Sequence, residues 1–132
     1  PFVSNDQLQD ELSAYNPLIP KGQELVATLM FEIDNVLSRT EFLNKVGGIE
    51  KKIFIKINNE IINSTSEKDV DRTSSEGKTS SVHFIHFNFT DEQIIRFKDL
   101  GNEVILGIDH KLYNHMTKIS EHTRKALIKD FA

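Results

Sequence analysis

The sequence predicts a single α+β domain over residues 1–132, with a mixed or antiparallel sheet and helices packed on one of its faces. Segments in which apolar residues alternate are separated by segments in which they recur at helical spacing, and this interleaving is typical of the class. A chain of 132 residues with 38% hydrophobic and 27% charged residues has the size of one domain with one core. The expected element order, β-α-β-β-α-β and then a helix, is that of a ferredoxin-like sandwich.

The first predicted strand is ELVATLMFEI, residues 24–33, because apolar residues alternate along it. Both of its faces are mostly apolar, which predicts a central strand. A helix should follow, with Asp34 or Asn35 as its N-cap and Gly47–Gly48 at its end. Before the strand, residues 7–14 are expected to form a short helical turn, and YNPLIPKG an extended connector.

Two more strands are predicted, KKIFIKIN at residues 51–58 and SVHFIHFNF at residues 81–89. The segment EIIN at 60–63 either prolongs the first of them or returns as a short partner. Residues 63–80 are polar, rich in serine and almost without apolar side chains, so they are expected to form a long solvated loop. Loops of this length often have a function.

The clearest local pattern is the start of the second helix. Thr90 is the expected N-cap, Gln93 completes a capping box, and Phe89 is placed to contact Ile94. The helix should end at Gly101. A strand, NEVILGID, then precedes a partly extended linker, HKLYNHMTKI, and a closing helix that begins at Ser120.

Composition excludes several classes of function. The chain has 16 Lys and Arg against 20 Asp and Glu, a net charge of −4, so it lacks the basic field that nucleic-acid binding requires. It has neither an apolar run long enough to span a membrane nor a signal-peptide pattern, and it is expected to be soluble. Since cysteine is absent, disulfides, thiolate metal sites and a cysteine nucleophile are excluded, and any metal would be bound by His, Asp or Glu.

The stretch KTSSVHFIHF, residues 78–87, places two histidines within a predicted strand. His83 and His86 are three residues apart, so they point to opposite faces of the sheet and cannot share one metal ion. His83 shares its face with Ile85 and Phe87. A histidine in such a position is more often hydrogen-bonded in or beside the core than engaged with a ligand.

A second group of polar residues, GIDHKLYNH, follows the last predicted sheet strand. If the strand of His83 lies near this one, then His83, Asp109, His110 and His115 can converge into a nitrogen and oxygen site suited to Zn²⁺, Fe²⁺ or Mn²⁺. The spacing fits no established zinc motif. The alternative is that these side chains satisfy backbone groups of the loop.

Four residues are candidates for ligand binding: Arg72, Lys78, Ser80 and Tyr113. Arg72 and Lys78 would hold a small anion or a substrate carboxylate, and the alternative is that both are simply solvated. The segment GKTS is not a phosphate-binding loop, because Arg72 stands where the first glycine is required and a strand follows in place of a helix. No residue is identified as catalytic, since no serine elbow or similar nucleophile pattern occurs.

Three motifs together, ELxAYNPLIPxG, KTSxVHF and LGIDHxxYxH, resemble an uncharacterised bacterial family, the domain of unknown function catalogued as three-five-zero-one. The likeness extends over nearly the whole chain. Two positions depart from the pattern: His86 stands where arginine is usual, and Lys111 where proline is common. The matching residues are Tyr15, Asn16, Pro17, Pro20, Gly22, Lys78, Thr79, Ser80, His83, Asp109, His110, Tyr113 and His115.

The resemblance implies a setting and no established reaction. Family members look longer at the N-terminus, which implies that this chain is the C-terminal part of a longer product. Their genes tend to lie beside those of rubrerythrin-like di-iron proteins and a cysteine-rich iron–sulfur oxidoreductase. This implies a cytoplasmic accessory role in electron transfer or in defence against peroxide and oxygen.

Three hypotheses therefore remain open. The first is an accessory binding domain that works with a redox partner. The second is a metal-dependent enzyme in which His83, His110 and His115 bind the ion, while Asp109 or Tyr113 acts as base or acid. The third is a structural subunit in which these side chains tie the long loop to the last strand by hydrogen bonds.

Overall fold

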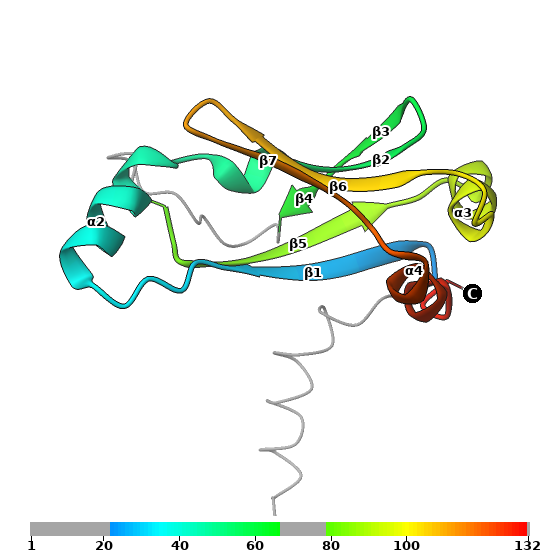
Figure 1. The fold of residues 1–132 in the computed structure, drawn as a ribbon, viewed down its shortest axis with the longest axis horizontal. Coiled ribbons are helices and arrows are strands. Elements are labelled where there is room, and N and C mark those ends of the chain that lie inside the picture. Colours follow the sequence, from blue (N-terminus) through cyan, green and yellow to red (C-terminus); the bar gives the residue numbers. More distant parts are fainter. Residues whose placement is uncertain (1–21, 67–78, 132) are drawn as a thin grey trace, which may run out of the picture.

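The computed structural model describes residues 22–66 and 79–131, which form two antiparallel sheets that lie one over the other (Figure 1). The predicted elements at residues 7–14 and 15–21 fall outside the described residues. One sheet has the order β1-β5-β4, with β1 at Glu24–Met30, β5 at Val82–Asn88 and β4 at Thr65–Ser66. The other has the order β3-β2-β6-β7, with β3 at Glu60–Asn63, β2 at Ile53–Ile57, β6 at Val104–His110 and β7 at Tyr113–Lys118.

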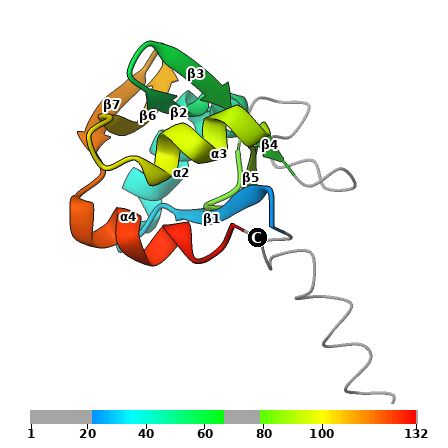
Figure 2. The same ribbon diagram turned by 90° about the vertical axis from the view of Figure 1, so that its right-hand side faces the viewer.

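The helices lie at the two ends of the sheets. Helix α2, Val36–Lys45, and the 3₁₀ turn η2, Ile49–Lys51, lie at one end, and α3, Asp91–Lys98, and α4, Glu121–Ile128, lie at the other (Figures 1 and 2). Within the described part of the chain, no helix is long and apolar enough to cross a membrane.

The α+β class is confirmed, but the arrangement of strands differs from the expected ferredoxin-like one. All pairings between the named strands are antiparallel, the strands divide between two sheets, and the helices flank the sheets instead of covering one face. The segment read as a linker contains β7, which pairs with β6, and the segment read as a long loop contains β4. The strand at 24–30, expected to be central, lies at the edge of its sheet.

The core lies between the two sheets, where the predicted alternation is confirmed. In the first sheet Leu25 lies opposite Phe87, and Ala27 lies opposite Ile85. Leu25, Ile85 and Phe87 are buried, and from the second sheet Ile53, Ile55 and Ile57 are buried with them. At the α3 and α4 end, the rings of Phe89, Phe97 and Phe131 contact one another with centroids 4.9–5.6 Å apart.

The three predicted helix starts are confirmed, and the last is Ser120, whose hydroxyl accepts a hydrogen bond from the Thr123 N–H at 3.2 Å. Asn35 is the N-cap of α2, because its side-chain oxygen accepts a hydrogen bond from the Ser38 N–H at 2.9 Å. Thr90 and Gln93 form the predicted capping box at the start of α3. After α2, Gly48 has a φ of 78°, a left-handed conformation that glycine adopts without steric cost.

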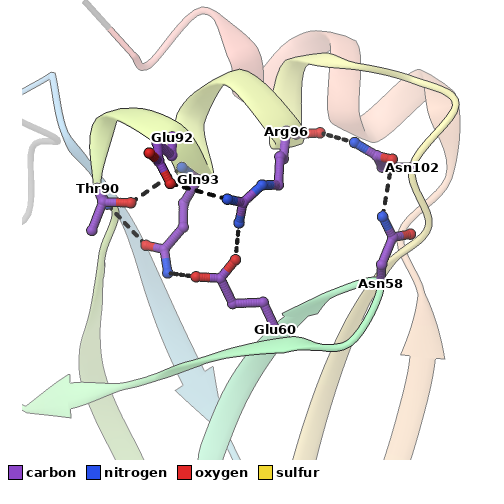
Figure 3. A network of polar contacts seen from close by, with 7 residues as sticks. All are labelled: Asn58, Glu60, Thr90, Glu92, Gln93, Arg96 and Asn102. Atoms are coloured by element: carbon purple, nitrogen blue, oxygen red, sulfur yellow. Dashed lines mark hydrogen bonds and ion pairs between the residues drawn. The ribbon is translucent and has the colours of Figure 1, made fainter.

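A polar network fastens α3 over the turn between β2 and β3 (Figure 3). The Glu60 carboxylate accepts a hydrogen bond from Gln93 Nε2 at 2.8 Å and forms an ion pair with Arg96. Next to it, the Asn58 amide donates to Asn102 Oδ1 at 2.9 Å. Arg96 and Glu60 are each about two-fifths exposed, so this network orients α3 and adds little net stability.

Candidate functional site

His83 and His86 point to opposite faces of the first sheet, as predicted. His83 is fully buried, and its Nε2 lies 2.7 Å from the Ser80 carbonyl and 3.2 Å from Thr79 Oγ1. Since a carbonyl only accepts, Nε2 carries the proton that it donates to Ser80. His86 lies on the outer face, where its Nδ1 is 3.1 Å from the Glu24 carboxylate. His83 therefore belongs to the core of the fold.

His110 joins the turn after β6 to the end of α2. Its Nδ1 accepts a hydrogen bond from the Leu112 N–H at 3.0 Å, so Nε2 is the protonated nitrogen and donates to the Gly47 carbonyl at 2.9 Å. Both ring nitrogens are thus engaged with backbone groups. This is the hydrogen-bonding role that was the alternative to metal binding.

The structure does not bring the predicted metal ligands together. Asp109 Oδ1 accepts a hydrogen bond from Asn114 Nδ2 at 3.0 Å, and since Asp109 and His110 are neighbours in one strand their side chains point to opposite faces. His83 lies in the other sheet. In residues 22–66 and 79–131 no three His, Asp or Glu side chains are arranged to share a metal ion.

Of the four candidate ligand-binding residues, the structure describes Ser80 and Tyr113. Arg72 and Lys78 lie outside the described residues. Ser80 precedes β5, where its hydroxyl accepts a hydrogen bond from the Val82 N–H at 3.3 Å and its carbonyl contacts His83. Tyr113 begins β7 and takes part in an aromatic cluster.

We expect His110→Phe to loosen the β6–β7 turn. The Leu112 N–H loses its acceptor, and the Gly47 carbonyl loses its donor. The expected loss is about 1–2 kcal/mol in the free energy of unfolding, with faster amide hydrogen exchange at Leu112. Lys111→Ala, one residue away and exposed, is the control and should change stability by less than about 0.5 kcal/mol. Unchanged exchange at Leu112 in His110→Phe would contradict the assigned role.

Aromatic rings connect the buried His83 to the exposed His115. Phe31 contacts His83 and Tyr113, each with centroids 6.1 Å apart. Phe42 from α2 contacts both Phe31 and Tyr113, at 5.0 and 5.6 Å. Tyr113 in turn lies against His115, with centroids 4.6 Å apart. The cluster therefore positions the His115 ring at the start of β7.

His115 also borders an apolar cavity of about 240 Å³ between the two sheets. The cavity lies where the sheets are open to one side, between the edge strands β1 and β7. Its walls include Ala27 and Leu29 from β1 and Leu106 and Ile108 from β6, all of which are only partly buried. The core of the sandwich is therefore incomplete along this side.

Reasoning from the sequence missed this cavity because β1 was expected to be central and β7 was expected to be a linker. A signal was present in YNHMTK, where Tyr113, His115 and Thr117 alternate with the other side chains. This alternation was obscured because the segment is polar, and all of its side chains after Tyr113 are exposed.

Comparison with known proteins identifies the family. The chain matches the family model described as "Protein of unknown function (DUF3501)" over residues 2–131, and no curated protein matches it. It is similar to the crystal structure of a novel protein of unknown function from Burkholderia pseudomallei K96243, with a TM-score of 0.87 and 32% identity over 99% of this chain and 68% of that chain. The resemblance seen in the motifs is confirmed, and the chain belongs to the DUF3501 family of proteins of unknown function.

Proposed function

We propose that this chain is a binding domain, and that the cavity between β1 and β7 takes up a small apolar ligand or the apolar part of a larger one. The observation that carries the proposal is the cavity of about 240 Å³, which has apolar walls and opens to one side of the sandwich. Ligand sites in proteins are typically concave and mostly apolar, with a few polar groups that set orientation.

The size of the cavity limits the ligand. An apolar cavity of about 150 Å³ is large enough for benzene, and pockets for drug-sized ligands begin at about 300 Å³. A volume of about 240 Å³ lies between these sizes. It therefore suits a single ring or a short alkyl chain.

The polar residues that border the cavity suggest the other end of the ligand. His115 and Thr117 from β7 line it, and both side chains are exposed. An imidazole and a hydroxyl can donate hydrogen bonds, so they suit a polar or anionic head group. The ligand class that combines both ends is a short-chain carboxylate or an aromatic carboxylate.

We expect straight-chain carboxylates from butanoate to decanoate to bind, with affinity rising with length until the cavity is full. Nuclear magnetic resonance titration should shift the amide signals of Leu29 and Leu106. Ala27→Phe, which places a ring inside the cavity, should weaken binding at least tenfold. Ala126→Phe is the matched control, because Ala126 is exposed on α4 and lies outside the cavity.

The polar end is tested separately with a charged and an uncharged probe. His115→Ala should weaken octanoate binding severalfold and leave 1-octanol binding nearly unchanged, because the alcohol lacks the carboxylate. If no probe binds saturably, or if Ala27→Phe and Ala126→Phe bind equally well, the proposed site is wrong.

The cellular setting in this proposal comes from the family resemblance alone. In it the domain is a cytoplasmic accessory protein that works beside a rubrerythrin-like or iron–sulfur oxidoreductase partner. Binding of such a partner is measurable by calorimetry with the purified proteins. Absence of heat in both pairings would remove the redox setting and leave the ligand site to be judged by its own experiment.

A further inference from the structure

We infer that the chain forms a homodimer through the edge of β1 that has no strand beside it in residues 22–66 and 79–131, in which the β1 strands of two copies pair antiparallel. The first sheet would then continue from one copy into the other. The same pairing would cover the open side of the apolar cavity, and this consequence rests on the proposed function. The dimer itself does not, because its test requires no ligand.

The composition of β1 suits pairing with a second copy. Its sequence, ELVATLM, contains no Lys or Pro, which natural edge strands use to prevent pairing with another chain, and its one charged residue, Glu24, stands at its first position. The other edge strands of the described structure are protected, since β4 has two residues, β3 has four and β7 ends in Lys118. A seven-residue apolar edge is therefore the one most suited to pairing.

The backbone groups of alternate residues in β1 point to that edge. The Phe31 N–H donates to the Ser81 carbonyl at 2.9 Å, which shows that odd-numbered residues here direct their backbone groups toward β5. Successive residues of a strand alternate in this respect. The N–H and C=O groups of Val26 and Thr28 therefore point to the free edge, where a second β1 can pair with them.

The β1 strand is self-complementary, as a two-fold interface requires. With the axis at Ala27, the small Ala27 side chains of the two copies meet at the close, non-hydrogen-bonded pair. Leu25 then lies opposite Leu29 of the second copy on the face toward the core. On the hydrogen-bonded pairs, Val26 lies opposite Thr28 of the second copy. None of these contacts places like charges opposite each other.

Charge selects the same register. In it Glu24, the only charged residue of β1, lies opposite Met30 of the second copy. A register centred on Thr28 would place Glu24 opposite Glu32, and like charges directly opposite are unfavourable. Glu24 is also already close to His86, at 3.1 Å, so its carboxylate has a partner within its own copy.

The pairing would also give the cavity a wall on its open side. Leu25, Ala27 and Leu29 share the face of β1 that looks toward the second sheet, and Ala27 and Leu29 line the cavity. The same residues of the second copy would continue this face across the open side. Each copy would thus contribute apolar side chains to the cavity of the other.

Sedimentation equilibrium on the unliganded chain tests the dimer. The average mass should rise with concentration from 15.1 kDa toward twice that value. Thr28→Pro should give a monomer, because the Thr28 N–H points to the free edge and its loss leaves the pairing with β5 intact. Circular dichroism checks that this variant is folded.

A charge pair at one exposed position provides a test that does not disturb the backbone. Met30 is 55% exposed. Met30→Glu would face Glu24 of the second copy twice in the dimer and should raise the dissociation constant about tenfold. Met30→Lys at the same position would face an opposite charge and should keep or lower it.

A chain that stays monomeric at every concentration would overturn the inference, as would a dimer that is equally stable in Met30→Glu and Met30→Lys. Ligand titration separates this outcome from failure of the proposed function. A dimer that binds no carboxylate sinks the ligand and keeps the interface. A monomer that binds octanoate keeps the ligand and sinks the interface.

Discussion

Replacing Arg124 by leucine should lower the free energy of unfolding by about 3 kcal/mol. Arg124 lies in α4 and is 4% exposed. Its guanidinium donates to the carbonyls of Phe97, Asp99 and Asn102, the second at 2.9 Å, and lies over the Phe97 ring at 5.4 Å. These carbonyls belong to the end of α3 and the turn after it, so the leucine variant would leave them without this donor.

The charge on Arg124 also suits this place, because a cation is favourable at the C-terminal end of a helix. Burial lowers the pKa of the guanidinium below its ordinary value, and the nearby carboxylates of Asp99 and Glu121 offset part of this shift. An arginine remains charged at neutral pH, so the variant loses a charged donor and not only packing. The effect is expected at all pH values at which the protein is normally handled.

Thermal and chemical unfolding measure the loss, which corresponds to a melting temperature lower by roughly 10 °C. Lys125→Leu is the matched control, since Lys125 is the next residue of α4 and its ion pair with Glu121 is exposed. It should change stability by less than about 0.5 kcal/mol. Arg124→Lys keeps the charge but loses the planar fork, and it should fall between the two. Equal stability of the leucine variants at 124 and 125 would contradict the assignment.

The local elements of the fold were predictable because their causes are local. The capping box of Thr90 and Gln93 and the N-cap of Asn35 depend on residues three positions apart, and both are confirmed. The alternation in β5 predicted, also from neighbouring residues alone, that His83 and His86 point to opposite faces, and the structure confirms this. In each case the interactions that decide the structure lie within one turn or one strand.

The pairing of strands was not predictable for a corresponding reason. Whether β1 is central or at an edge depends on what lies beside it, and its apolar composition fits both. β7 is polar because it is an exposed edge strand, and polar segments read as linkers. The division into two sheets, and with it the cavity, follows from contacts between residues far apart in the sequence.

The histidines show the same limit for the site. The sequence identified His83, His110 and His115 as a group, and the structure places each in different surroundings. What decides their roles is the bonding of the ring nitrogens. His110 engages both nitrogens with the backbone at Gly47 and Leu112, and no residue type or spacing reveals that in advance.

Replacing His83 by alanine is the other substitution with a large expected effect, a loss of about 3 kcal/mol in the free energy of unfolding. The side chain is fully buried, so its removal leaves a void beside Phe31 and takes the Nε2 donor from the Ser80 carbonyl. Because Phe31 also contacts Tyr113, the void should loosen the aromatic cluster that positions His115.

His86→Ala is the control for this variant, since it removes the same side chain from the opposite face of the same strand. Its hydrogen bond with Glu24 joins side chains that are 14% and 15% exposed, and we expect its removal to cost about 1 kcal/mol. Denaturant unfolding measures both losses.

Octanoate binding, measured at a temperature where both variants are folded, should weaken in His83→Ala and stay unchanged in His86→Ala. If the two variants lose equal stability, His83 is not a core residue of the kind its burial indicates. If His83→Ala loses stability but binds octanoate as tightly as the unchanged chain, then the contacts from His83 through Phe31 and Tyr113 to His115 do not position the polar end of the cavity.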